Sequence, residues 1–461
     1  GDRAFALNAY SAASGFYRRA LGLVAGEDER GQLLFGLGSA LDALADPEAA
    51  GHLSEASEAL RAEGDLETAA EAECALADLA FRTGDATGVD VHAGRAVELV
   101  RGRPPSAAHA HALSQAARFQ MLGGHPSESI ETGVKAEQMA TALGLDAIRA
   151  DVLATVGTSR AGLGDPQGDA DLETAIELAE AANAPLPLSR ALNNLAWRYS
   201  RVDARRGYEL MARNYEVQRR YGHAGQMWWA RGQLALGAFD VGRWDEALEH
   251  VNAVIAHVEA GTPHYIESTC RLDRAAVLLA RDDAGAFDSE LERALELAAG
   301  ATDPQARAPI AFDAAYFRLW ARDRAVARQL LDAGLEYVLA NEFAMDLVHY
   351  EASLVAVLLD LDPRELGIPP VMVADTPGLR ATAALLERDL VGAAEALAEL
   401  GDLTDEAYLR LRGGERLLDE GDTDAGIAQV ERALEFYRGV RATRFVAEAE
   451  ALLGSTRRRS A

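Results

Sequence analysis

Small side chains recur in this chain at a step of 39 or 40 residues, and this period limits the possible folds more than any other feature. One ladder consists of Ala77, Ala117, Gly157, Ala196, Ala235, Ala275 and Ala315. A second consists of Ala96, Ala136, Ala175, Asn214, Val254, Ala294 and Gly334. A fixed period of this length is the signature of a repeat protein, in which each unit packs on its neighbours. We therefore predict one long solenoid in place of several globular domains.

The segments between turns have the apolar spacing of amphipathic helices. One such segment places apolar side chains at every fourth position: Ile148, Val152 and Val156. It ends at Gly164-Asp165, where glycine suits a left-handed helix end and aspartate can cap the next helix. Similar turns recur at Gly242-Arg243 and Gly421-Asp422. The predicted unit is helix, tight turn, helix, looser turn, and the predicted fold class is all-α, an α-solenoid of antiparallel helix pairs.

The segment from Gly242 to Leu248, GRWDEAL, resembles the inter-helix turn of the tetratricopeptide repeat (TPR) family. Against the pattern of that family, the first ladder falls at the small position of helix A and the second at the small position of helix B. Close helix approach explains both, because overpacking such a contact costs ~1–3 kcal/mol. The resemblance is strongest over residues 65–340 and implies a TPR-like superhelix of 39–40-residue repeats.

The period fails between residues 360 and 378, where four of the 14 prolines lie. This interruption divides the chain into five expected segments. Residues 1–24 form an N-terminal helix or helical hairpin, and residues 25–359 form the regular TPR-like solenoid. Residues 360–378 form a Pro-rich loop, residues 379–454 form C-terminal TPR-like repeats with a capping helix, and residues 455–461 form a basic tail.

The formal net charge of −28 argues against binding to nucleic acids or anionic membranes, because both need a basic face. The two cysteines, Cys74 and Cys270, lie in apolar helical segments, as buried thiols of a reducing compartment do. The sequence has no 18-residue apolar stretch and no signal segment. We expect a cytoplasmic protein without a membrane span. Since the chain starts at Gly1 without a methionine, we also expect it to be part of a longer protein.

Catalytic motifs are absent from the sequence. It contains no G-x-x-x-x-G-K-[ST] phosphate loop, no G-x-S-x-G elbow and no H-E-x-x-H metal-binding helix. A seven-residue spacing relates His250, His257 and His264, with Glu246 and Glu249 nearby. This spacing leaves a metalloenzyme hypothesis open beside the simpler interpretation of solvated surface histidines. We expect no enzyme activity, metal or cofactor in this chain.

The segment from Trp197 to Arg231, here called the arginine–tryptophan region, differs from the rest of the chain. It holds eight arginines against three acidic residues, a local charge of +5 (8 − 3), and four of the five tryptophans lie between residues 197 and 244. Arginine binds carboxylates and phosphates, and aromatic side chains anchor interfaces. Alternatively, the aromatic side chains fill the solenoid core and the arginines pair with acidic neighbours. The candidate binding residues are Asn193, Asn194, Trp197, Arg198, Arg201, Asn214, Tyr215, Trp228 and Arg231.

Residues 1–21 and 261–283 resemble the C-terminal TPR region of large bacterial regulators, in which an adenylate/guanylate cyclase domain and a STAND-type ATPase precede the repeats. MalT-like transcription activators carry a similar arm. The resemblance implies a non-catalytic interaction or sensor arm that binds a protein, peptide or small-molecule inducer in its groove and controls upstream domains of the same polypeptide. The alternative is a stand-alone peptide or small-ligand receptor like the TPR pheromone sensors of bacteria.

Overall fold

The computed structural model describes residues 1–23, 29–83, 85–221, 224–300, 304–340, 348–371 and 375–459. Within these residues the chain forms 24 α-helices and no β-strand, which confirms the all-α prediction. None of the helices in the described ranges is both long and apolar enough to cross a lipid bilayer.

The chain divides into two compact units, which we describe separately. Unit 1 comprises residues 1–195 and 212–230, and unit 2 comprises residues 196–211 and 231–461. The division passes through three consecutive helices: α11 (Pro185–Tyr199), α12 (Ala204–Tyr221) and α13 (Ala224–Asp240).

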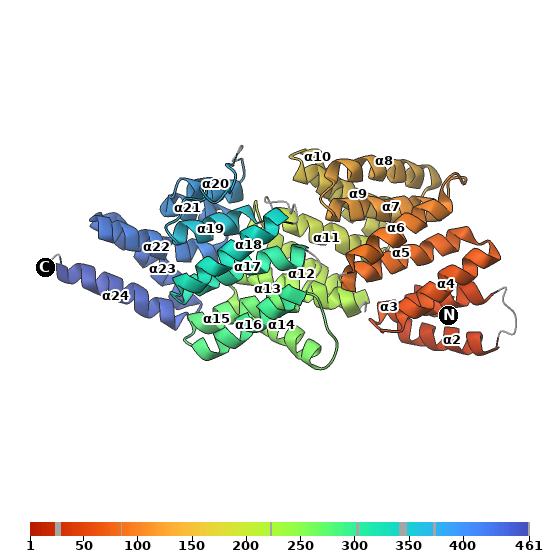
Figure 1. The fold of residues 1–461 in the computed structure, drawn as a ribbon, viewed down its shortest axis with the longest axis horizontal. Helices are drawn as coiled ribbons and strands as arrows, with labels where there is room; N and C mark the ends of the chain where they lie inside the picture. Colours follow the sequence, from red (N-terminus) through yellow and green to blue (C-terminus); the bar gives the residue numbers. More distant parts are fainter. Residues whose placement is uncertain are drawn as a thin grey trace. The chain divides into compact units, whose positions relative to one another are not determined.

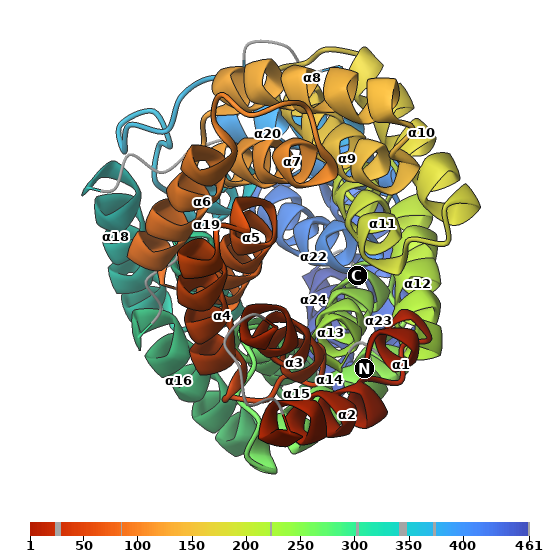
Figure 2. The same ribbon diagram turned by 90° about the vertical axis from the view of Figure 1, so that its right-hand side faces the viewer.

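Unit 1 is a row of helix pairs (Figure 2). Its other helices are α1 (Asp2–Ala6), α2 (Tyr10–Leu23), α3 (Arg30–Ala43), α4 (Ala49–Glu63), α5 (Leu66–Thr83), α6 (Ala86–Val100), α7 (Ala107–Leu122), α8 (Pro126–Leu143), α9 (Asp146–Gly162) and α10 (Gln167–Ala181). Each helix contacts the next one in sequence, and α3, α5, α7 and α9 also contact one another in succession. The first helices of the pairs therefore form one continuous layer.

Unit 2 continues the same pairing (Figure 1). Its other helices are α14 (Trp244–Glu259), α15 (Glu267–Ala280), α16 (Ala284–Gly300), α17 (Pro304–Trp320), α18 (Arg324–Ala340), α19 (His349–Leu358), α20 (Pro377–Leu386), α21 (Leu390–Leu400), α22 (Leu403–Glu420), α23 (Thr423–Gly439) and α24 (Thr443–Arg459). Here α15, α17 and α19 contact one another in succession, so the layer of first helices is present in this unit too.

The two ladders are buried where the helices meet. Every alanine of both ladders is at most 1% exposed, and so are Asn214 and Val254. At Gly157 the helices are so close that an added Cβ would lie 2.8 Å from the carbonyl oxygen of Gly168. The ladders therefore mark helix–helix contacts, as the TPR resemblance implies, because only small side chains fit at this separation.

The tight turns adopt a left-handed backbone whether or not a glycine is present. Gly164 and Gly421 have φ of +77° and +92°, and Asp282 and Arg322 reach +68° and +63° at equivalent turns. The following residue can then start the next helix, and the Asp422 carboxylate accepts a hydrogen bond from the Ala425 backbone N–H at 3.3 Å. These four turns thus share the same backbone geometry.

In unit 2 the C-terminal repeats pack back onto earlier ones. The indole of Trp244 lies parallel to Trp320 with ring centroids 6.2 Å apart, and Trp320 stacks on Tyr408 of α22 at 5.5 Å. The indole Nε1 of Trp244 donates to the Thr404 hydroxyl at 2.9 Å, and that hydroxyl donates to the Phe239 carbonyl at 2.5 Å. Residues about 160 positions apart therefore share one aromatic core, which a repeat packed only on its sequence neighbours would not form.

The structure refines three of the expected segments. The N-terminal segment contains the two helices α1 and α2, and the expected boundary between residues 24 and 25 lies outside the described residues. In the Pro-rich segment, Ile368 is 2% exposed and packs into the unit 2 core, while α20 already begins at Pro377. The last helix continues through the expected basic tail to Arg459. Within it the hydroxyls of Ser455 and Thr456 donate to the Leu452 carbonyl.

Candidate functional site

The arginine–tryptophan region lies on α11, α12 and α13. Each of these three helices contributes residues to both units. Of the nine candidate residues, five belong to unit 1: Asn193, Asn194, Asn214, Tyr215 and Trp228. Four belong to unit 2: Trp197, Arg198, Arg201 and Arg231.

The two asparagines of α11 are half-buried and hydrogen-bonded within unit 1. The Asn193 carboxamide oxygen accepts a hydrogen bond from the Trp229 indole at 3.3 Å. The Asn194 carboxamide donates to the Ala154 backbone carbonyl of α9 at 3.4 Å. Both side chains therefore connect α11 to neighbouring helices of the repeat array.

Asn214, the residue that interrupts the second ladder, lies in the interior. Its side chain is 1% exposed, and its carboxamide oxygen accepts a hydrogen bond from the Ser189 hydroxyl of α11 at 2.8 Å. A buried polar group needs such a partner, so this pair stabilises the contact of α11 with α12. The neighbouring Tyr215 and the more distant Trp228 are half-buried.

Of the four candidates in unit 2, Trp197 is exposed and the other three are half-buried. The Trp197 side chain is 44% exposed, and the Arg201 guanidinium lies 4.9 Å from its ring centroid, within the range of a cation–π contact. Arg231 donates through Nε to Nδ1 of His250 at 3.3 Å. Burial, together with the positive charge of Arg231, lowers the pKa of His250. Arg198 is half-buried.

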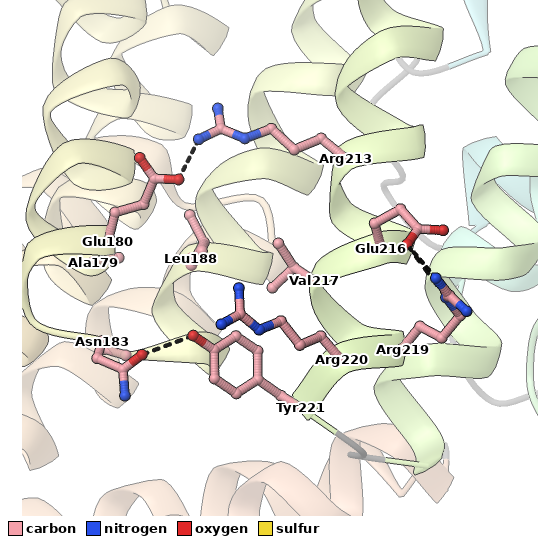
Figure 3. Close-up of a pocket in the computed structure, with 11 residues that line it drawn as sticks. Ala179, Glu180, Asn183, Leu188, Arg213, Glu216, Val217, Arg219, Arg220 and Tyr221 are labelled. Carbon is pink, nitrogen blue, oxygen red and sulfur yellow. Dashed lines mark hydrogen bonds and ion pairs between the residues drawn. The ribbon is translucent and has the colours of Figure 1, made fainter.

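A groove of about 690 Å³ opens in unit 1 between the C-terminal ends of α10 and α12 (Figure 3). We call it the α10–α12 groove. Its lining residues are Ala179, Glu180, Asn183, Ala184, Leu188, Arg213, Glu216, Val217, Arg219, Arg220 and Tyr221. The groove falls within the volume range of small-ligand sites, roughly 300–1,000 Å³.

Two ion pairs lie at the edges of the groove. Arg213 of α12 pairs with Glu180 of α10 across the groove. Arg219 pairs with Glu216 one turn earlier on the same helix, at 2.7 Å. These pairs are solvent-exposed and each contributes little to stability, ~0–1 kcal/mol. They do, however, satisfy the charges of two of the three arginines.

The third arginine, Arg220, has no such partner. In the described part of the chain no carboxylate oxygen lies within 4.0 Å of its guanidinium, which rests 5.8 Å from the ring centroid of Tyr221. The Tyr221 hydroxyl donates to the Asn183 side-chain oxygen at 2.7 Å, across the groove. In Figure 3 the Arg220 guanidinium lies between this hydrogen bond and the Arg213–Glu180 pair. The groove therefore presents a cation with five N–H donors beside an aromatic ring.

Arg213, Arg219 and Arg220 are three of the eight arginines of the arginine–tryptophan region, but none of them is among the nine candidate residues. Which arginines line the groove depends on how α12 packs against α10. The residues that meet there are far apart in sequence, since Asn183 and Tyr221 are separated by 38 positions. This separation is close to one repeat, so the period itself could have paired the end of α10 with the end of α12.

Among the described residues, the histidines of the metalloenzyme hypothesis belong to no group of metal ligands. The Glu246 carboxylate lies 3.9 Å from Nε2 of His250. His264 accepts a hydrogen bond at Nδ1 from the Ile266 backbone N–H at 3.2 Å. Throughout the described ranges, no three histidine, cysteine, aspartate or glutamate side chains converge as metal ligands would.

Comparison with known proteins supports the fold. No protein-family model and no curated protein matches the chain. Among solved structures, the chain is similar to a Rap protein complexed with competence and sporulation factor, with a TM-score of 0.54 and 11% identity over 81% of this chain and 99% of that one. The chain therefore has a TPR-like fold.

Two further structures show a looser similarity. The apo form of the quorum sensor NprR from B. thuringiensis gives a TM-score of 0.46 at 11% identity, covering 80% of this chain and 97% of that one. A signal transduction ATPase with a tetratricopeptide repeat sensor from Pyrococcus horikoshii gives 0.43 at 11% identity, covering 87% of this chain and 55% of that one.

Proposed function

We propose that this chain is a non-catalytic interaction or sensor arm of a larger bacterial signalling regulator of the cyclase or STAND-ATPase type. In this proposal the α10–α12 groove binds a carboxylate of a peptide or protein partner, and binding controls upstream domains. The observation that carries the proposal is Arg220, a guanidinium without a carboxylate partner among the described residues in a groove of ligand size.

The chemistry of the groove supports a carboxylate ligand. An arginine fork forms two parallel hydrogen bonds with a carboxylate, which gives both affinity and orientation. The ring of Tyr221 offers a flat surface beside it, held by its hydrogen bond to Asn183. Of the nine candidates from the sequence, Trp197 and Arg201 remain in the proposal as a separate contact in unit 2, since the Trp197 ring is 44% exposed.

Two hexapeptide libraries of random sequence, identical except for a free or an amidated C-terminal carboxylate, test this function. We expect the chain to enrich peptides from the free-carboxylate library and not from the amidated one. Arg220→Ala should weaken binding of the enriched peptides about tenfold, equivalent to ~1.4 kcal/mol.

The matched control is Arg103→Ala, which removes an exposed arginine from another part of unit 1. It should leave binding unchanged. Equal enrichment from both libraries, or equal loss in both variants, would contradict the proposal. Binding by the isolated chain without any effect on upstream domains in the full-length protein would favour the stand-alone receptor.

A further inference from the structure

Unit 2 gathers six carboxylates from successive repeats. They are Asp240 of α13, Asp273 of α15, Asp313 of α17, Glu351 of α19, Asp402 at the start of α22, and Asp405 of α22. We call them the carboxylate cluster. Burial raises the pKa of Asp240, and the negative charges of Asp273, Asp405 and Glu351 raise it further.

Among the residues that the structure describes, none forms an ion pair with the carboxylate cluster. In the described part of unit 2 no arginine, lysine or histidine nitrogen lies within 4.0 Å of any of the six carboxylates. Asp273 is only 4% exposed, yet its Oδ2 has no hydrogen-bond partner, and the same holds for Oε2 of Glu351. Burying an unpartnered carboxylate is costly. Burial, together with the negative charge of Asp313, accordingly raises the pKa of Asp273.

Unit 1 shows the contrast. There Asp78 is ion-paired with Arg118, and Asp151 with Arg190 at 2.8 Å. Arg190 and Arg82 further lower the pKa of Asp78. These two carboxylates of unit 1 are thus ion-paired with arginines, whereas the arginines of α15 in unit 2, Arg271 and Arg274, pair with other carboxylates such as Glu290.

The groups that face the cluster are mostly neutral or acidic. The Tyr316 and Tyr350 hydroxyls donate to the two carboxylate oxygens of Asp405, each at 2.9 Å. The charges of Arg201 and His349 lower the pKa of Glu351, but burial outweighs them and the pKa is raised. The charge of Glu406 adds to the acidic neighbours of Asp402.

A single metal ion does not suit these residues. Over the described ranges no three of the carboxylates converge closely enough to hold one ion. Separate acceptors on five helices, flanked by tyrosine rings, suit a ligand that carries several separated positive charges. Asp240, Asp313, Glu351 and Asp405 are each partly exposed.

We propose that the carboxylate cluster of unit 2 binds an organic cation through ammonium or guanidinium groups, with Asp273 and Asp313 as its innermost acceptors. This site is independent of the α10–α12 groove in unit 1. A free polyamine and the basic side chains of a peptide share the required chemistry, and the experiment separates these two sources.

Isothermal titration calorimetry at low ionic strength tests the site with three probes: spermidine, an end-blocked Arg-Ala-Arg-Ala-Arg peptide, and Mg²⁺ alone. We expect spermidine or the peptide to bind, and the one that binds identifies the source. Binding should release protons at about pH 7, because the cation favours the ionised carboxylates; titrations in buffers of different ionisation enthalpy measure this release.

The variant Asp273→Asn/Asp313→Asn should weaken binding of the cation about tenfold or more. The matched control Glu292→Gln/Glu420→Gln removes the same charge from exposed positions of unit 2 and should change binding less than about twofold. Circular dichroism checks that both variants are folded. No binding of either organic cation, equal loss in both variants, or site-specific binding of Mg²⁺ alone would overturn the proposal.

Discussion

The carboxylate cluster makes the stability of unit 2 depend on pH in an unusual direction. Burial, assisted by the negative charge of Glu351, raises the pKa of Asp405 from 3.8 to about 6. Between these two values the folded state binds more protons than the unfolded state, so the free energy of unfolding falls as pH rises. A shift of roughly two units corresponds to a loss of ~3 kcal/mol once the pH exceeds both values.

Hydrogen exchange followed by mass spectrometry measures this effect in unit 2 itself. After correction for intrinsic exchange, amides of α15, α17 and α22 should lose protection as the pH rises from about 5 to about 8. Amides of α7 and α9 in unit 1 serve as the internal reference. Asp78 of α5 is ion-paired with Arg118 of α7. The charges of its arginines outweigh burial and lower the pKa of Asp78, and such a carboxylate loses its stabilising effect only in strong acid.

The substitution Glu351→Gln identifies the cause. It removes a charge that raises the pKa of both Asp405 and Asp313, so the loss of protection with pH should become smaller. The exposed control Glu292→Gln should leave the pH dependence as it is. Protection of α17 and α22 that stays constant or rises with pH, or an unchanged profile in Glu351→Gln, would refute this reasoning.

Three further predictions concern packing and reactivity. Trp320→Ala should lower the free energy of unfolding of unit 2, measured by chemical denaturation, by ~3–5 kcal/mol. Trp320→Phe should lower it much less, because it keeps a ring and removes an indole N–H that has no partner. Gly168→Ala should lower the free energy of unfolding by ~1–3 kcal/mol, because the added Cβ would lie 2.5 Å from a backbone nitrogen of α9. Gly162→Ala should be neutral, because the space around Gly162 is open. Equal effects of the two substitutions would contradict the close approach of the helices. Burial raises the pKa of the Cys74 and Cys270 thiols, so iodoacetamide should modify neither in the folded protein; rapid modification would show that they are accessible.

The fold could be predicted from the sequence because its determinants are local and periodic. The ladder alanines and the glycine turns each act within one repeat, and the structure has them at helix contacts and at left-handed helix ends. The packing of α22 against earlier helices could not be predicted in this way. Trp244 and Thr404 are separated by several repeats, and no period links an indole N–H to a particular hydroxyl.

For a related reason, the sequence predicted the region of the candidate site but not the individual residues that line it. Composition identified the arginines and aromatic side chains between residues 197 and 231, but not which of them face a groove. Asn214 interrupts a ladder of small residues, yet it forms a buried hydrogen bond with Ser189, whereas Arg220 is regular in sequence and lines the groove. The direction of a side chain depends on helix contacts that one sequence does not specify.

In unit 2 the C-terminal repeats pack against earlier repeats of the same unit. This packing fixes the number of repeats that lie between the two packed segments. An open solenoid can gain or lose a repeat because each interface is the same as the next. In unit 2, inserting or deleting one repeat between α15 and α21 would move Thr404 away from Trp244 and separate Arg441 from Asp245. The unit should therefore fold and unfold as one cooperative block of high contact order, and its gene segment should resist the repeat duplications by which solenoids evolve.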